Sequence, residues 1–145
     1  MLIGSFDIES LTQKLVLESS LESIEVVENL IAKVKEEYGI NDDNYNQIWI
    51  VLNEAVTNAI KHGNKYDLSK KVSLTVESKD ERYICFTVKD EGNGFDPNKV
   101  PDPTAAESIA EPNGRGVFLI NKLSDTVKFS DNGRKVEMCF DLYKN

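Results

Sequence analysis

The segment Asn53–Asn64, with the sequence NEAVTNAIKHGN, constrains the fold of this chain more than any other stretch. Glu54 and Asn58 are four residues apart, so a helix stacks them on one face. Gly63 is expected to end this helix in a left-handed conformation. The pattern predicts a helix from about Tyr45 to His62 with a polar face opposite a buried face. The apolar residues at helical spacing that form the buried face are Ile48, Leu52, Ala55, Val56, Ala59 and Ile60.

The polar face of this helix suits a metal-assisted reaction. Mg²⁺ prefers hard oxygen ligands and keeps several waters, so one or two protein ligands suffice. The carboxylate of Glu54 beside such a metal can also orient or deprotonate a nucleophile. The alternative is a solvated polar face on an amphipathic helix, which is common for an isolated E-x-x-x-N pair. Motifs further along the chain favour the first interpretation.

The composition is that of an ordinary globular protein and excludes some partners. A length of 145 residues suits one domain, and the hydrophobic and charged fractions of 40% and 29% are typical of soluble folds. The net charge of −8 argues against direct binding of nucleic acid, which needs clustered Lys and Arg. Nucleotide binding remains possible, because Mg²⁺ and backbone N–H groups can supply the positive field.

The chain carries no pattern typical of membrane insertion or secretion. No apolar run approaches the roughly 20 residues of a membrane span, and the start, MLIGSFDIES, lacks the basic and long apolar regions of a secretory signal. Cys85 and Cys139 lie in apolar runs, where we expect them to be small buried residues with free thiols in a reducing compartment. A single histidine and the lack of C-x-x-C exclude a multi-histidine zinc site. We therefore expect a cytoplasmic protein that does not engage a membrane.

Hydrophobic periodicity predicts the remaining elements. A helix is expected over 21–38, with Ser20 as N-cap and Gly39 after its last turn, and Asp42 or Asp43 is expected to cap the next helix. Another helix should follow Gly114. The predicted strands are 14–18, 72–76, 83–88, 126–129 and 136–142. The resulting fold class is α+β, a two-layer α/β sandwich with helices packed on one face of a mixed, mostly antiparallel sheet.

A short motif, D-x-G-x-G, follows the central predicted strand. Asp90 stands at the end of that strand, where a carboxylate can accept a hydrogen bond from an exocyclic amine. Gly92 and Gly94 would let the backbone approach a flat ligand closely. Alone, the motif also resembles a plain turn, because Gly and Asp dominate turns.

A proline-marked run, Pro97–Asn113, has no clear period and is expected to form a mobile lid. Gly114, Arg115 and Gly116 then open a helix. Free backbone N–H groups at a helix start form an anion site, although a lone G-x-G is also common in ordinary loops.

The order of these parts resembles the Bergerat ATP-binding fold (GHKL family), shared by gyrase, the Hsp90 chaperone, sensor histidine kinases and mismatch-repair MutL. The resemblance covers about 14–142, so the chain of 145 residues is expected to be a single histidine-kinase-like ATPase domain. Within the family the chain looks most like the stand-alone anti-sigma serine/threonine kinases. The core E-A-V-T-N-A-x-x-H-G closely matches their N box and is the most specific part of the resemblance.

The resemblance implies roles for individual residues. Glu54 matches the general base, Asn58 the Mg²⁺ ligand, and Asp90 the carboxylate that recognises adenine. Thr57 matches a position near the protein partner. The other matches are expected to lie along the nucleotide, and they are His62, Gly63, Gly92, Gly94, Gly114, Arg115 and Gly116.

One place departs from the family pattern. The family often carries a small hydroxyl residue after a glycine at the start of the last strand, near adenine. Here the matching residues are Gly133, Arg134 and Lys135. We therefore expect adenine to be recognised without that hydroxyl, through Asp90 and a water.

The resemblance implies a kinase that uses ATP and Mg²⁺ to phosphorylate a serine or threonine of an anti-anti-sigma protein, and that sequesters a sigma factor. One alternative is a nucleotide-gated protein-binding module that transfers no phosphate. Another is an interaction domain in which the motif matches are coincidental. A homodimer is also possible, through apolar residues outside the buried helix stripe such as Val26.

Overall fold

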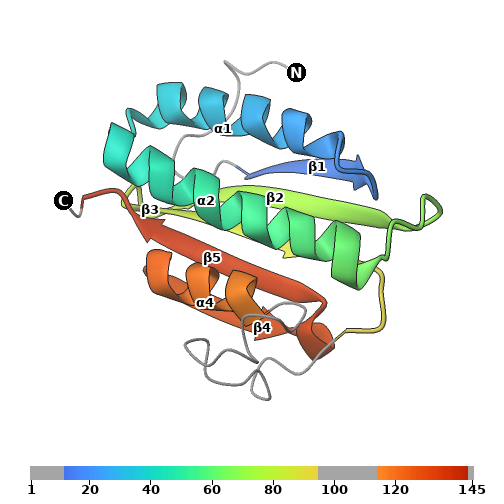
Figure 1. Ribbon diagram of the computed structural model, residues 1–145. Helices are drawn as coiled ribbons and strands as arrows, with labels where there is room; N and C mark the ends of the chain where they lie inside the picture. Colours follow the sequence, from blue (N-terminus) through green and yellow to red (C-terminus); the bar gives the residue numbers. More distant parts are fainter. Residues whose placement is uncertain (1–11, 95–113, 144–145) are drawn as a thin grey trace.

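The computed structural model describes residues 12–94 and 114–143 (Figure 1). Its elements, in chain order, are β1 (Thr12–Glu18), α1 (Ser23–Tyr38), α2 (Asp42–Asn58), the π-helix η3 (Ala59–Gly63), β2 (Lys71–Lys79), β3 (Tyr83–Lys89), α4 (Gly114–Leu123), β4 (Thr126–Ser130), the 3₁₀ turn η5 (Asp131–Gly133) and β5 (Lys135–Asp141). Every helix and strand expected from the sequence is present, with ends that shift by a few residues.

The strands form a five-stranded sheet in the order β1-β2-β3-β5-β4. All four pairings in this sheet are antiparallel. The sequence predicted a mixed, mostly antiparallel sheet, but the described strands form no parallel pair. Tight turns reverse the chain between β2 and β3 and between β4 and β5, and such turns can join only antiparallel neighbours. β3 occupies the centre, as its apolar run predicted.

The helices α1, α2 and α4 lie on one face of the sheet (Figure 1), which confirms the predicted two-layer α+β sandwich. Every residue of the predicted α2 stripe is buried in the core between the layers. The strands supply the other half of that core: Val72, Leu74 and Val76 of β2 are buried, whereas the residues between them are partly exposed. Within the described ranges, none of the helices is long and apolar enough to span a bilayer.

The start of α1 differs from the prediction. The helix begins at Ser23, and Glu22 holds the N-cap position without a side-chain cap. Ser20, expected as the N-cap, instead heads a turn in which its Oγ accepts the N–H of Glu22 at 3.3 Å. The serine hydroxyl competes for backbone donors before the helix starts. At the other end, Gly39 adopts the predicted left-handed conformation with φ 61°.

The cap of α2 is also one residue away from the prediction. The side chain of Asn41 accepts the N–H of Asn44 at 2.8 Å, so the assignment of the cap to Asp42 or Asp43 is wrong. Both aspartates lie in the first turn instead, where their negative charges interact favourably with the positive end of the helix dipole.

The expectation that both cysteines carry free thiols is wrong. Cys85 of β3 and Cys139 of β5 are directly paired in the sheet register and form a disulfide, with Cα atoms 4.1 Å apart. They are buried as expected, at 1% and 7% exposure. The alignment of two strands 54 residues apart in the chain brings them together, and periodicity within each strand cannot reveal it.

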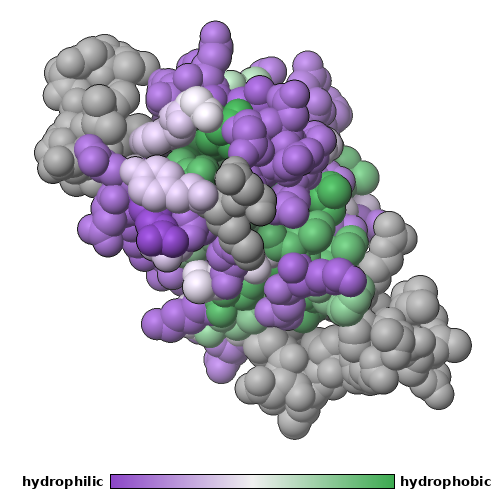
Figure 2. Space-filling model, turned by 90° about the vertical axis from the view of Figure 1, so that its left-hand side faces the viewer, coloured by the Kyte–Doolittle hydropathy of each residue, from purple (hydrophilic) through white to green (hydrophobic). Residues whose placement is uncertain are grey.

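Several large apolar residues of the described ranges are exposed at the surface. From the side that lies on the left in Figure 1, hydrophilic residues dominate the surface, with hydrophobic residues visible between them (Figure 2). Val26 of α1 is exposed, in line with its position outside the buried stripe of that helix. A homodimer through it stays a prediction.

The layer contact can be tested with two isoleucines of α2. Ile48 is fully buried and Ile50 is 41% exposed. Ile48→Ala is expected to lower the free energy of unfolding by about 2–5 kcal/mol, because it removes core contacts and leaves a cavity. Ile50→Ala, in the same helix, is expected to change it by less than about 1 kcal/mol. Urea unfolding of the two variants compares these values, and equal losses would contradict the described packing.

Candidate functional site

A cleft opens between the end of α2, the helix α4 and the ends of β3 and β5. The space inside it that water-sized groups can reach is about 50 Å³. The residues that line it combine an apolar wall with a few polar groups, and they are Ala55, Asn58, Ala59, His62, Gly63, Val88, Asp90, Gly94, Val117, Ile120, Phe129, Gly133, Arg134 and Val136. Mostly apolar clefts with a few convergent polar groups are typical of small-molecule sites.

Asp90 is the buried carboxylate of this cleft. It follows β3, and its main-chain N–H donates to the carbonyl oxygen of Arg134 at 2.9 Å. Its Oδ1 accepts the N–H of Gly92 at 2.8 Å. Burial raises the pKa of the Asp90 carboxyl above its ordinary value, although the bond from Gly92 and the charge of Arg134 act in the opposite direction. The loop thus holds a partly desolvated acceptor at a fixed place.

Gly63 ends the helical segment for a different reason than predicted. It belongs to η3 and does not have a positive φ; Asn64 follows as the cap with φ −84°. A Cβ on Gly63 would lie 2.5 Å from the Cγ of Asp90, and a Cβ on Gly92 would overlap the carbonyl oxygen of Gly63. Glycine is therefore required here by the close approach of the helix end and the loop after β3.

Asn64, which was not among the predicted site residues, holds this contact together. Its buried side chain donates to Ser19 Oγ at 2.9 Å and to the carbonyl oxygen of Lys71 at 3.0 Å. Its Oδ1 accepts the N–H of Glu91 at 2.8 Å. One amide thus joins the end of the helix to the residue after β1, to the start of β2 and to the loop that carries Asp90. The sequence did contain a signal for this role, because Asn64 is the last residue of the most specific motif of the chain.

Asn58 lies one turn before His62 and contacts α4 at one end of the cleft. A Cβ on Gly116 would overlap Asn58 Nδ2, so the first turn of α4 packs directly on the side chain of Asn58. Gly114 and Arg115 belong to the same first turn, which places the G-x-G inside the helix rather than before it. The first turn of α4 therefore lies at this end of the cleft, and the main-chain N–H groups of a helix start can bind an anion.

Glu54 lies one turn before Asn58 on α2 and does not line the cleft formed by the described residues. His62 does line it. Burial lowers the pKa of the His62 imidazole below its ordinary value, and the charge of Lys61 adds to this effect. The neutral imidazole is thus favoured at the cleft.

Arg134 occupies the position at which the family often carries a small hydroxyl residue. Its Nη2 lies 2.9 Å from Asp131 Oδ1, and its Nη1 donates to the carbonyl oxygen of Gly92 at 3.4 Å. Gly94 packs nearby, with φ 83° and no room for a Cβ beside the carbonyl oxygen of Asn132. An arginine therefore lines the cleft beside Asp90, at the position that the family pattern places near adenine.

The described structure brings most predicted site residues to one place. Asn58, His62, Gly63, Asp90 and Gly94 line the cleft. Gly92 and Gly116 pack just behind them, and Gly114 and Arg115 lie at the start of α4. The expected lid, Pro97–Asn113, lies outside the described residues. An apolar wall, a buried acceptor and glycines that exclude a Cβ suit a flat base bearing an amine, and the start of α4 suits an anion.

The comparison with protein families agrees with this geometry. The chain belongs to the histidine kinase-like ATPase domain family, whose model matches residues 17–140. This family membership confirms the resemblance found in the sequence, and it implies that the chain binds ATP.

Among individual proteins, the chain is similar to serine-protein kinase RsbW of Bacillus cereus (strain Q1). The two are 27% identical over 124 residues, which cover 81% of this chain and 76% of that protein. The same identity and coverage relate it to serine-protein kinase RsbW of Bacillus thuringiensis subsp. konkukian (strain 97-27) and of Bacillus anthracis (strain A0248).

The environment of Asp90 predicts a dependence of stability on pH. Because its pKa is higher in the folded protein than in the unfolded chain, the folded protein binds more protons between the two values. The contribution of Asp90 to the free energy of unfolding therefore falls as the pH rises from the ordinary aspartate value of 3.8 through the raised value. Asp90→Asn should remove this decline.

Denaturant unfolding at a series of pH values would measure the difference in the free energy of unfolding between wild type and Asp90→Asn. The difference should decrease with rising pH. Asp80→Asn, in the exposed turn between β2 and β3, is the control for loss of one carboxylate. A constant difference for Asp90→Asn would contradict the raised pKa.

Proposed function

We propose that this chain is an ATP- and Mg²⁺-dependent protein kinase that phosphorylates a serine or threonine of an anti-anti-sigma protein and sequesters a sigma factor. The observation that carries the proposal is the contact of Gly63 with Asp90, because it joins the two most informative motifs at one cleft. Membership of the ATPase domain family and the similarity to serine-protein kinases support it.

In this proposal the floor of the cleft holds the adenine. Asp90 accepts a hydrogen bond from the exocyclic amine, and the apolar wall around Val88 and Val136 packs on the ring. The N–H of Gly92 keeps the Asp90 carboxylate oriented. Arg134 closes this end of the cleft in place of the hydroxyl residue that the family often uses.

The other end of the cleft holds the phosphates and the metal. Asn58 offers an amide oxygen to Mg²⁺, and His62, with Gly63 beside it, lines the cleft as a neutral imidazole. Gly114, Arg115 and Gly116 place N–H groups of the α4 terminus near the phosphates. When bound, ATP supplies the γ-phosphoryl group and Mg²⁺ neutralises the charge on its oxygens.

Glu54 is the proposed general base. It stands one turn from Asn58 on the same helix, outside the base-binding part of the cleft, so a substrate hydroxyl could approach it from solvent. Its carboxylate accepts the proton of the serine or threonine hydroxyl, while the rest of the catalytic effect comes from positioning and charge neutralisation.

The partners follow from the resemblance to anti-sigma kinases. The anti-anti-sigma protein receives the phosphate, and the sigma factor binds in a second state of the same surface, where Thr57 lies beside Asn58. A cytoplasmic location, one domain over residues 1–145 and a homodimer belong to the same proposal.

The first experiment is calorimetric titration of the purified chain with ATP, with and without Mg²⁺. The wild type is expected to bind ATP with Mg²⁺ and more weakly without it. Asp90→Asn should weaken binding about 10- to 100-fold, because a hydrogen bond to a buried charged acceptor is lost. Asp80→Asn should bind like the wild type. If the wild type binds no ATP at millimolar concentration, either with or without Mg²⁺, the result would contradict the proposed site.

The second experiment separates catalysis from binding. Glu54→Ala is expected to bind ATP within a few-fold of wild type and to transfer phosphate to an anti-anti-sigma protein at least about 100-fold more slowly, because the general base is missing. Labelled ATP and the separated partner protein report the transfer. Unchanged transfer would show that Glu54 is not the base.

A second candidate function is a nucleotide-gated binding module that transfers no phosphate. The observation that favours it is Arg134, which replaces the hydroxyl expected near adenine and pairs with Asp131. Affinity for a partner that depends on ATP, with no labelled partner after long incubation, would support this module over the kinase.

A further inference from the structure

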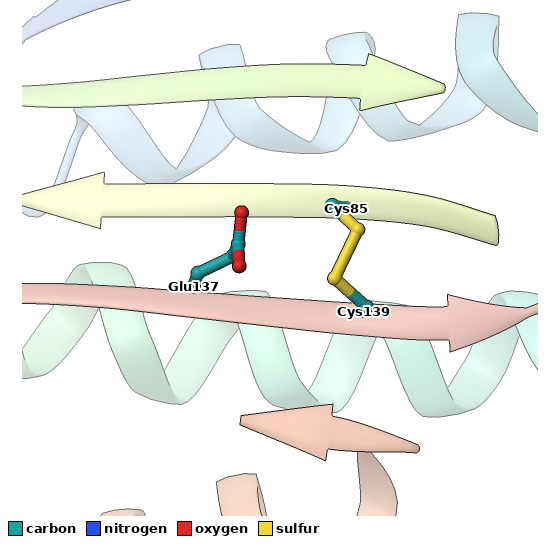
Figure 3. Close-up of side chains that lie close together, drawn as sticks. All are labelled: Cys85, Glu137 and Cys139. Carbon is teal, nitrogen blue, oxygen red and sulfur yellow. A yellow bond between two sulfur atoms is a disulfide. The ribbon is translucent and has the colours of Figure 1, made fainter. Parts of the chain in front are cut away.

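The face of the sheet opposite the helices carries a second cluster of reactive side chains. Cys85, Glu137 and Cys139 come from the two neighbouring strands β3 and β5. Their sulfur and carboxylate oxygen atoms lie within 4.8 Å of one another. Figure 3 shows the Glu137 carboxylate between the strands, beside the bond that joins the two cysteines. The cluster lies behind the cleft, which opens on the helix side.

We propose that, when the disulfide is reduced, Cys85, Cys139 and Glu137 bind a divalent cation of the zinc class, and that the disulfide is the closed, oxidised form of this site. Two thiolates and one carboxylate are ligands that Zn²⁺ accepts in tetrahedral sites, with water in the fourth position. Thiolate ligands select such borderline-soft ions over Mg²⁺ or Ca²⁺. The proposal does not depend on the kinase function.

The sheet register holds the ligands without rearrangement of the backbone. Cys85 and Cys139 are direct partners in the β3–β5 ladder, and Glu137 stands two residues before Cys139 on the same face. Both strands lie inside the sheet, where each pairs with a neighbour on both sides. The site is therefore preorganised, which lowers the cost of bringing three ligands to one ion.

Neighbouring charges set how readily the cation binds. Lys79 Nζ lies 3.2 Å from Glu137 Oε2, and the lysine side chain is 43% exposed. It orients the carboxylate in the disulfide form and must turn to solvent when a cation arrives. Glu77 of β2 is the direct partner of Cys85 on its other side and adds negative charge that favours the cation.

The chemistry of opening the site balances with a phosphine reductant. The phosphine attacks one sulfur and water completes the reaction, so the products are two thiols and the phosphine oxide. Cation binding then releases the two thiol protons to solvent. Reoxidation by an added disulfide compound transfers two electrons and two protons from the cysteine thiols to that compound, which is released as two thiols, and forms the bond between Cys85 and Cys139.

The probe is Co²⁺, which replaces Zn²⁺ in tetrahedral sites and gives a thiolate-to-metal absorption band. The chain is reduced, freed of phosphine without oxygen and titrated with Co²⁺, then with Zn²⁺. One equivalent of Co²⁺ should produce the band and Zn²⁺ should remove it. Oxidised chain, Cys85→Ser and Cys139→Ser should give no band. A reduced wild type without the band would overturn the proposal.

Two further variants test the carboxylate and the lysine without removing a sulfur. Glu137→Gln should weaken Co²⁺ binding at least about tenfold, whereas Glu18→Gln, on the same face at the edge strand β1, should not change it. Lys79→Gln should tighten binding about two- to fivefold, because the competing ion pair is lost. Equal affinities for Glu137→Gln and wild type would overturn the role of Glu137.

Discussion

The close contact between Gly63 and the carboxyl group of Asp90 is the constraint on which the cleft depends. It brings the end of the helical segment onto the loop after β3, at a distance that a Cβ would prevent. The buried side chain of Asn64 then holds the two pieces together with hydrogen bonds to Ser19 after β1, to the start of β2 and to the same loop. The walls and the polar floor of the cleft meet there for two reasons. Gly63 leaves room for the close contact, and the side-chain amide of Asn64, the next residue, holds that contact with hydrogen bonds.

The two faces of the sheet carry different kinds of residues. The helix side holds the apolar core, and the cleft forms where that core ends, between α2 and α4. The opposite side carries polar residues and the disulfide between the inner strands β3 and β5. Because side chains alternate along a strand, residues next to each other in sequence, such as Val136 and Glu137, serve the cleft on one face and the cysteine cluster on the other.

Much of the fold could be predicted because its signals are local. The α2 stripe and the alternation of β2 depend on residues a few positions apart, and both are confirmed. The cap of α2 was misplaced because Asn41 and the aspartates after it are all good caps. The disulfide and the place of Arg134 depend on strand register and loop contacts between distant segments. The proposed catalytic roles rest on the family resemblance.

The Cys85–Cys139 bond also changes the covalent topology of the chain. It closes a ring that begins in β3, contains α4 and β4, and ends in β5, with the two cysteines 54 residues apart. A protease that cuts once anywhere inside this ring leaves one covalently joined molecule that is heavier by a single water, and two fragments separate only after reduction. Asp90 and the helix α4 lie on opposite sides of a cut made between them, and they therefore stay in one molecule for as long as the bond persists.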